Sequence, residues 1–195
     1  MSDQESSTHL PSLANDIRWG NTTLTGCHPI TGIPRSPLLQ SVNLVPFVDD
    51  RVLVITSDAD KFLLPGGTIE RGETLRQTID REMREETGYA IDTCYPFAIL
   101  ECFSHDDKPW REHLAHPEFE RLLCFGDVHR IGVPENPAGA ERVARLELLP
   151  LHEAIQRFHN ADRPELADIY TVAATFHRSA HALPGLPIDD TPYTS

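Results

Sequence analysis

Hydrophobic and polar residues along this chain follow the period of a β-strand in several segments. From Ser41, "SVNLVPFV" and "RVLVIT" are rich in β-branched and aliphatic residues and flank Asp49 and Asp50, which predicts a β-hairpin. "YPFAILECF" and "FERLLCFGDV" predict two longer strands, separated by the polar loop "SHDDKPWREHLAHPE". "VARLELL" predicts a further strand.

Helical periods occur in three other segments. Residues 75–87 carry an apolar stripe with a spacing of one helical turn, formed by Leu75, Ile79 and Met83. Thr74 with Gln77 predicts a capping box before this helix, and Gly88 predicts a left-handed cap after it. "PLHEAIQRF" predicts a short helix with proline in its first turn, and "PELADIYTVAATFHR" predicts a terminal helix. Helices interspersed among strands predict an α/β fold, with a mixed β-sheet between helices.

The two ends of the chain have a different composition. The first forty residues are rich in Ser, Thr, Pro and Gly, which predicts little continuous regular structure there apart from a short strand in "DIRWGNTTL". The last segment, "ALPGLPIDDTPYTS", predicts a tail. The sequence therefore predicts an N-terminal extension over residues 1–40, one domain over residues 41–180 and a C-terminal tail over residues 181–195.

Charge and cysteine content narrow the classes of function. The 195 residues include thirty acidic and seventeen basic side chains, and the formal net charge is -13. Such a charge repels nucleic-acid backbones, so we expect no large nucleic-acid partner, whereas a small phosphorylated substrate held through metal ions fits. The polar N-terminus, the absence of a membrane-length apolar run and four cysteines without a CxxC pair favour a cytoplasmic protein with no membrane partner.

The stretch "LPGGTIERGETLRQTIDREMREETGY", residues 64–89, contains six acidic side chains. In a helix, Glu82 and Glu86 lie one turn apart and Glu85 lies beside them. Their mutual repulsion grows on burial unless cations neutralise it. Hard divalent cations bind to carboxylates together with substrate phosphates. The stretch therefore indicates a site for Mg²⁺ or Mn²⁺, and the alternative is a solvated helix face with i,i+4 ion pairs.

The same stretch resembles the Nudix box, G-x5-E-x7-R-E-U-x-E-E-x-G-U with U apolar. The match comprises Gly67, Glu73 and the run "REMREETGY" at residues 81–89, where Tyr89 takes the place of the usual aliphatic residue. A chance match is on the order of one in a million. The likeness extends over about residues 41–179, and it implies a Nudix-type α/β/α sandwich that hydrolyses, with Mg²⁺ or Mn²⁺, a nucleoside diphosphate linked to another group.

The resemblance also implies roles for individual residues. Glu82 and Glu86 would be the main metal ligands, and Glu85 would be either a further ligand or the catalytic base. Gly67 would offer its backbone carbonyl to the metal ion. These roles agree with the chemistry, because the charge of a pyrophosphate has to be neutralised before water attacks phosphorus.

Other residues around the box have supporting or alternative roles. Glu73 and Arg81 would orient the loop of the box. Glu141, in "PENPAGAERV", is a second candidate for the catalytic base, and its alternative is an exposed loop charge. Two basic residues either contact phosphate or balance local charge, Arg71 and Lys61.

Subfamily motifs outside the box leave the substrate open. The proline of one group of ADP-ribose hydrolases and the tyrosine of many dinucleoside polyphosphate hydrolases are missing near residues 103–105, and the NADH and coenzyme A hydrolase elements are absent. The sequence favours a MutT-like pyrophosphohydrolase of small nucleotides, including (deoxy)nucleoside triphosphates. The alternatives are an ADP-ribose or nucleotide-sugar pyrophosphatase and a catalytically silent nucleotide sensor, although the intact box glutamates favour an enzyme.

Two other activities fit the sequence less well. An isopentenyl diphosphate isomerase would need a catalytic cysteine in a distinctive context, which is not found, and the acidic charge argues against RNA decapping.

The loop 104–118 contains Trp110 and three histidines, His105, His113 and His116. We expect a polar surface loop, with a base-binding lid or a metal site as the alternatives. Many Nudix enzymes form dimers, so a homodimer is also a candidate.

Overall fold

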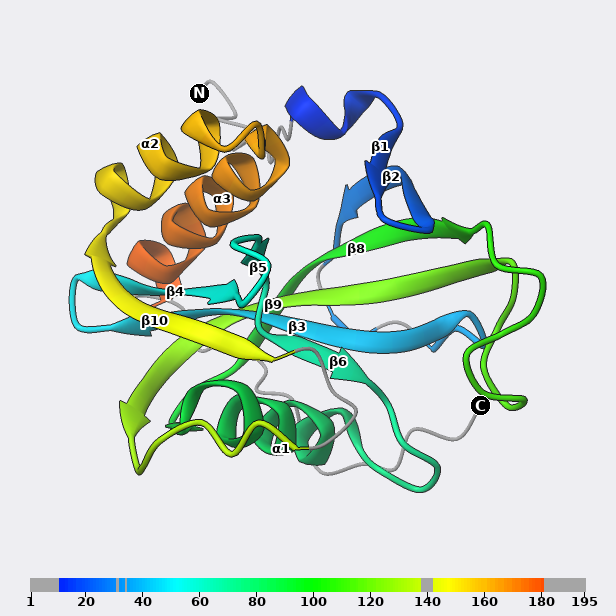
Figure 1. The fold of residues 1–195 in the computed structure, drawn as a ribbon, viewed down its shortest axis with the longest axis horizontal. Coiled ribbons are helices and arrows are strands. Elements are labelled where there is room, and N and C mark those ends of the chain that lie inside the picture. Colours follow the sequence, from blue (N-terminus) through cyan, green and yellow to red (C-terminus); the bar gives the residue numbers. More distant parts are fainter. Residues whose placement is uncertain (1–10, 31, 34, 138–141, 181–195) are drawn as a thin grey trace, which may run out of the picture.

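A single mixed β-sheet forms the centre of the protein (Figure 1). The computed structural model describes residues 11–30, 32–33, 35–137 and 142–180. Within them the main strand order is β1-β2-β8-β9-β3-β4-β10, with β5 beside β4, β6 beside β3 and β7 beside β9. The strands are β1 (Ile17–Trp19), β2 (Thr22–Pro29), β3 (Leu39–Val48), β4 (Arg51–Ser57), β5 (Phe62–Leu63), β6 (Gly66–Thr68), β7 (Tyr89–Ile91), β8 (Tyr95–Ser104), β9 (Glu118–Arg130) and β10 (Val143–Pro150).

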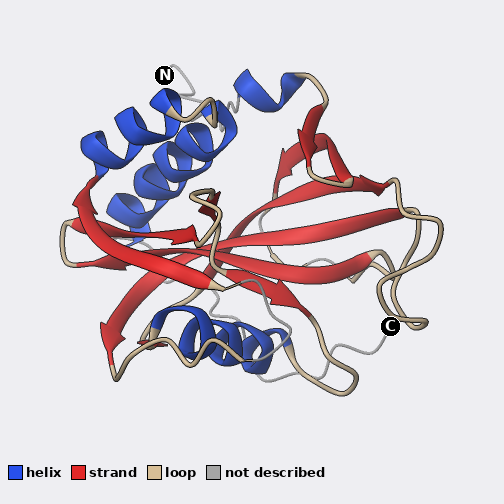
Figure 2. Cartoon of the chain, in the orientation of Figure 1, coloured by secondary structure: helices blue, strands red, loops and turns tan. Residues whose placement is uncertain are grey.

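Helices cover both faces of this sheet. They are the short 3-10 helix η1 (Pro11–Ala14), α1 (Leu75–Thr87), α2 (Leu151–Asn160) and α3 (Pro164–Ala180). Helix α1 lies against one face, and α2 and α3 lie against the other (Figures 1 and 2). Side chains of β3 alternate between the two cores, since Val45 and Phe47 pack on the side of α2 and α3, whereas Val42 and Leu44 pack on the side of α1. The predicted α/β fold is confirmed.

Local signals determine the hairpin and the first long helix as predicted. β3 and β4 pair around a turn in which Asp49 adopts φ 56°, a left-handed conformation that Asp tolerates better than most residues. Thr74 and Gln77 form the capping box of α1, and Gly88 closes the helix at φ 72°. The position of Pro150 differs from the prediction, since this proline occupies the N-cap position of α2 and not its first turn.

The N-terminal residues contribute more regular structure than the sequence predicted. β1 and β2 form a hairpin, and β2 pairs antiparallel with β8. A short strand was predicted within residues 16–24, and the structure has two strands that extend to Pro29, so the prediction of little continuous structure is wrong for residues 25–29. Glycine and proline are accommodated here because Gly26 lies at a shift in register and Pro29 is the last residue of the strand. The predicted tail, residues 181–195, lies outside the described residues, and the domain limits at residues 40 and 180 stay predictions.

The loop of the box is added to the sheet at one edge of β3. The first part of that edge, Ser41–Asn43, pairs with β6, and the last part, at Phe47 and Val48, pairs with β4. The opposite edge of β3 pairs in parallel with β9. Because β6 and β4 share this edge, the segment 64–68 lies beside β3 and directly before the loop that leads into α1. In the described part of the chain, no helix is long and apolar enough to span a membrane.

Substituting Leu24 by alanine tests whether the N-terminal hairpin belongs to the folded domain. Leu24 is 1% exposed and belongs to the core on the side of α2 and α3. We expect Leu24→Ala to lower the free energy of unfolding by about 2–5 kcal/mol, as measured by urea denaturation. The control is Thr25→Ala, at the next and exposed position of the same strand. Equal effects of the two substitutions would show that the hairpin contributes little to stability.

Candidate active site

The loop of the box folds back onto α1 through a bidentate ion pair. Arg81 donates from Nε to Glu73 Oε1 at 2.8 Å and from Nη2 to Glu73 Oε2 at 3.0 Å. Glu73 Oε2 also accepts hydrogen bonds from the Thr78 hydroxyl at 2.9 Å and from the Glu70 backbone N–H at 3.0 Å. Burial alone would raise the pKa of Glu73, but the hydrogen bonds from Arg81 and Thr78 hold this pKa below its ordinary value. Loop and helix are thereby fixed to each other.

Arg81 also contacts two of the carboxylates on its own helix. Its Nη1 donates to Glu82 Oε1 at 2.7 Å and lies 3.5 Å from Glu85 Oε2. Its Nη2 donates to the backbone carbonyl of Thr68 at 3.1 Å. Hydrogen bonds from Arg81 to Glu73, together with its contacts to Glu82, raise the pKa of the guanidinium above its ordinary value despite burial. Arg81 therefore remains charged among its carboxylate neighbours.

The charged form of the Glu82 carboxylate is disfavoured in this place. Its side chain is only 14% exposed. Burial raises the pKa of Glu82, and the negative charges of Glu85 and Glu73 act in the same direction, while Arg81 only partly offsets them. A cation at this carboxylate would relieve both effects.

Glycines bring the backbone of the loop against two of these carboxylates. A side chain at Gly67 would put its Cβ only 2.3 Å from Glu82 Oε1, so the Glu82 carboxylate would have to shift from its observed place. The neighbouring residue, Gly66, donates its backbone N–H to Glu86 Oε2 at 2.9 Å. Glu82 and Glu86 thus both lie beside the segment formed by these glycines, as the predicted ligand set requires.

The donor set at this place fits a hard divalent cation. Carboxylates of Glu82, Glu85 and Glu86 and the carbonyl of Gly67 would supply only oxygen atoms, which Mg²⁺ and Mn²⁺ prefer. In the described part of the chain, no three His, Cys, Asp or Glu side chains form a preformed metal cluster. The contacts already described explain this spread, because Glu82 and Glu85 turn to Arg81 and Glu86 turns to Gly66.

Several other predicted residues lie away from this group or outside the described part of the chain. Glu141 belongs to residues 138–141, which lie outside the described residues, so its role stays a prediction. The segment before it approaches the box, since Asn136 donates its N–H to the backbone carbonyl of Glu85 at 3.0 Å. Lys61 and Arg71 are both exposed.

The loop with three histidines is attached to the body of the fold by separate contacts. His105 Nε2 lies 2.8 Å from the Thr23 hydroxyl of β2, whereas the contact of His116 Nε2 with the carbonyl of Asp106, at 2.8 Å, is within the loop itself. Arg111 forms an ion pair with Glu70 of the box loop. A pocket of about 240 Å³ lies between the two loops. Its lining includes Gln40, Arg71 and His113.

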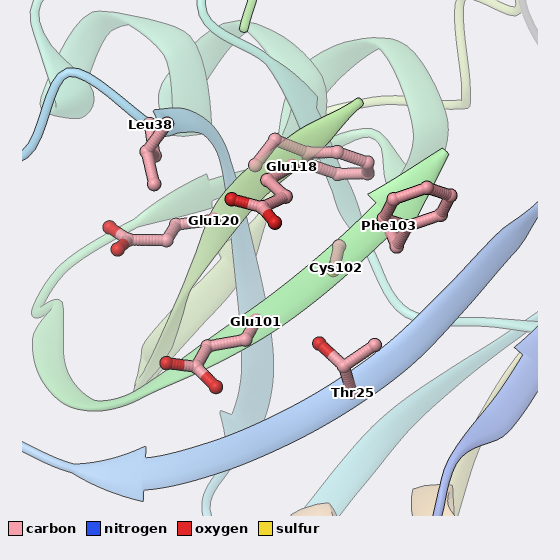
Figure 3. Close-up of a pocket in the computed structure, with 8 residues that line it drawn as sticks. Thr25, Leu38, Glu101, Cys102, Phe103, Glu118 and Glu120 are labelled. Carbon is pink, nitrogen blue, oxygen red and sulfur yellow. The ribbon is translucent and has the colours of Figure 1, made fainter. Parts of the chain in front are cut away.

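A second pocket, of about 380 Å³, lies on strands β2, β8 and β9 (Figure 3). Glu101 of β8 is directly opposite Glu120 of β9 in the register, and Glu118 lies two residues before Glu120. Figure 3 shows these carboxylates with Phe103 and Thr25 around the same hollow. None of the box residues lines this pocket, so it is separate from the candidate metal site.

Three residues around the site escaped the sequence reasoning. The Thr78 hydroxyl and the Thr68 carbonyl contact the Glu73 and Arg81 pair. Asn43, in the middle of β3, donates from Nδ2 to the carbonyls of Leu64 and Pro65. The only available signal for Asn43 was a lone amide within the apolar run "SVNLVPFV".

Replacement of Arg81 by alanine should destabilise the protein because it leaves partly buried carboxylates without a counter-charge. Hydrogen bonds to charged groups contribute about 1.5–3 kcal/mol each, so we expect a loss of at least about 2 kcal/mol in the free energy of unfolding. The matched control is Arg84→Ala on the same helix, whose half-exposed pair with Glu135 at 3.1 Å contributes less than about 1 kcal/mol. Urea denaturation of both variants gives the comparison, and a smaller loss for Arg81→Ala than for Arg84→Ala would contradict it.

Comparisons with known proteins show the family of this chain. A family model described as the NUDIX domain matches residues 37–169. Among solved structures, a Nudix hydrolase from Nitrosomonas europaea has a TM-score of 0.53 at 19% identity, covering 80% of this chain and 97% of the other. A pyrophosphohydrolase from Bacillus subtilis has a TM-score of 0.49 at 15% identity, covering 69% of this chain and 76% of the other. No curated protein sequence matches. Since the family model spans more than half of the chain, this protein belongs to the Nudix hydrolase family.

Proposed function

We propose that this chain hydrolyses a pyrophosphate bond in a small nucleotide and that Mg²⁺ or Mn²⁺ is held by Glu82, Glu86 and the carbonyl of Gly67. Nudix hydrolases are pyrophosphohydrolases that act on small nucleotides and generally use divalent metal ions. The observation that carries the assignment to these residues is the approach of Gly67 to Glu82, where a Cβ would lie 2.3 Å from the carboxylate. With glycine at this position, the backbone approaches that carboxylate without displacing it.

The residues of the box have distinct tasks in this proposal. Glu82 and Glu86 provide negative oxygen ligands from successive turns of α1. The pair of Glu73 and Arg81 holds the loop of the box against the helix. Bound divalent cations supply charge neutralisation of the pyrophosphate and a lower pKa for an attacking water.

Two carboxylates are candidates for the base that accepts the proton of that water. Glu85 lies on α1 with its side chain 21% exposed, near the guanidinium of Arg81. Glu141 belongs to the connection between β9 and β10, the same connection from which Asn136 contacts the backbone of Glu85. The roles of both stay proposals.

The substrate that we propose is a nucleoside diphosphate linked to a further group, with (deoxy)nucleoside triphosphates as the first candidates. ADP-ribose and nucleotide sugars are the alternatives within the same reaction class. A nucleotide sensor without hydrolysis is the alternative outside it, and the complete set of box carboxylates argues against this alternative. A homodimer and a cytoplasmic location stay predictions.

Removal of either proposed metal ligand should abolish hydrolysis. We expect Glu82→Gln and Glu86→Gln to lower kcat by about 100-fold or more, because each loses a charged ligand of the ions that stabilise the transition state. The purified protein is assayed with Mg²⁺ or Mn²⁺ on a panel of nucleoside triphosphates, dinucleoside polyphosphates, ADP-ribose and nucleotide sugars. EDTA should abolish all turnover in this assay.

The control for these substitutions is Asp80→Asn on the same helix, which removes a carboxylate that is paired with Arg76 and is not one of the proposed ligands. It should retain the parental rate. Rates reduced only a few-fold in the Glu82 and Glu86 variants would refute the ligand assignment. If the parent protein hydrolyses no substrate of the panel with either metal, the result would favour a nucleotide sensor without hydrolysis.

A comparison of Glu85→Gln with Glu141→Gln identifies the base. Loss of a general base lowers kcat by about 100-fold to 10,000-fold, and the affinity for Mn²⁺ stays unchanged if the residue is not also a ligand. We expect one of the two variants to show this pattern and the other to remain within about tenfold of the parent. Steady-state kinetics with Mn²⁺ titration provides both quantities. Two unaffected variants would exclude both residues.

A further inference from the structure

A buried amide in β3 lies behind the glycine segment of the box. Asn43 is only 4% exposed and is opposite Gly66 in the pairing of β3 with β6. Its Nδ2 donates to the carbonyl of Leu64 at 3.1 Å and to the carbonyl of Pro65 at 3.3 Å. A polar side chain in the middle of an apolar strand is unfavourable unless its hydrogen bonds are made, and these two contacts satisfy the donor end of the amide.

The neighbouring carbonyls determine which way this amide is oriented. Both partners of Nδ2 are acceptors, so the reversed orientation would place Oδ1 against two carbonyl oxygens. In the observed orientation, Asn43 Oδ1 has no hydrogen-bond partner in the described part of the chain. The two Nδ2 contacts are therefore made although the other end of the amide is buried and unsatisfied. The position is selective for a side chain that donates twice.

The peptide between Pro65 and Gly66 transmits this constraint to the metal-binding helix. Its carbonyl oxygen accepts from Asn43 Nδ2 and from the backbone N–H of Leu44, the latter at 2.9 Å. The peptide is trans and planar, so its N–H points away from its carbonyl. That N–H belongs to Gly66 and donates to Glu86 Oε2 at 2.9 Å. Fixing the carbonyl on β3 thus aims the N–H at Glu86.

The conformation of Gly66 makes the arrangement specific. Gly66 adopts φ 126°, a value that residues with a side chain rarely adopt. A Cβ at this position would lie 2.2 Å from the carbonyl of Val42 and 3.0 Å from Asn43 Nδ2. The amide of Asn43 therefore packs against the face of Gly66 that has no side chain, and both residues are needed to hold the peptide plane.

We propose that Asn43 is a positioning residue for the metal site, acting through the Pro65–Gly66 peptide to orient the carboxylate of Glu86. The inference rests on the proposed function in one respect, namely that Glu86 is a metal ligand. Asn43 itself touches neither metal nor substrate in this scheme. Substitution of a residue that orients a metal ligand, without touching the metal itself, lowers metal affinity or activity by about 10-fold to 100-fold.

The test measures metal affinity of the folded protein in the absence of substrate. Asn43→Asp keeps the shape of the side chain and replaces the donor by an acceptor, and Asn43→Leu removes both polar atoms. We expect each to weaken Mn²⁺ binding, measured by electron paramagnetic resonance titration, by about tenfold or more. Ser41→Ala is the matched control, because Ser41 is equally buried on β3 and is opposite Thr68 of β6, away from the Pro65–Gly66 peptide. It should leave Mn²⁺ affinity unchanged.

A double-mutant cycle with Glu86→Ala separates the positioning role from a general effect on folding. Without the carboxylate, the N–H of Gly66 has no ligand to orient, so Asn43→Asp should weaken Mn²⁺ binding far less in the Glu86→Ala background than in the parent. A residue that only stabilises the fold would lower the urea midpoint and leave the Mn²⁺ affinity of the folded protein unchanged. Asn43→Ser, which keeps a neutral hydrogen-bonding group in a smaller side chain, replaces the other two variants if neither folds.

The outcomes for the two hypotheses are distinct. Weaker Mn²⁺ binding in Glu86→Ala and in the Asn43 variants, with non-additive effects, supports the positioning role. Weaker binding in Glu86→Ala with parental affinity in the Asn43 variants overturns that role and leaves the proposed function intact. Additive effects also overturn it, because Asn43 would then act independently of Glu86. Unchanged affinity in Glu86→Ala refutes the proposed ligand set itself.

Discussion

The guanidinium group of Arg81 is shared among three carboxylates, and the acidic helix depends on it. Two like charges about 4 Å apart near a protein surface repel by about 4 kcal/mol, which is a large fraction of the stability of a small domain. Arg81 offsets this repulsion by binding Glu73 with two hydrogen bonds and by contacting Glu82 and Glu85. Only a planar guanidinium has enough donors in one place to do this, so lysine would not be equivalent.

This compensation is incomplete, and the incompleteness has a chemical consequence. The pKa of Glu73 is held below its ordinary value, whereas burial raises the pKa of Glu82 despite its hydrogen bond from Arg81. The pKa values of Glu73 and Glu82 are thus shifted in opposite directions, although both carboxylates contact the guanidinium of Arg81. Glu73 is a structural partner of Arg81, whereas Glu82 is a buried carboxylate beside Gly67 whose charged form is disfavoured. A divalent cation at Glu82 would stabilise that charged form.

The sequence was sufficient where the determinants are local. The apolar stripe of α1, its capping box and the left-handed Gly88 all lie within a few residues of one another, so helix limits followed directly from them. The hairpin around Asp49 is local in the same sense. By contrast, β2 exists because it pairs with β8, which lies about seventy residues later in the chain, and no local pattern shows that pairing.

The same distinction separates the predictable and unpredictable parts of the site. The box residues were found from their spacing, and the fold-back of Glu73 onto Arg81 followed from the resemblance. Asn43 could not be found in this way, since its partners Leu64 and Pro65 become neighbours only when β6 is added to the edge of β3. The role of Glu141 stays a prediction because it lies outside the described residues.

The box loop also has a contact that joins it to the part of the chain where substrate selection is expected. Glu70 bonds through its side chain to Arg111 of the loop between β8 and β9, and through its backbone N–H to Glu73. Glu73 in turn holds Arg81. A ligand in the neighbouring pocket, between His113 and Arg71, would therefore contact a segment only three residues from a partner of Arg81. A surface loop is in this way connected to the helix that carries the box carboxylates.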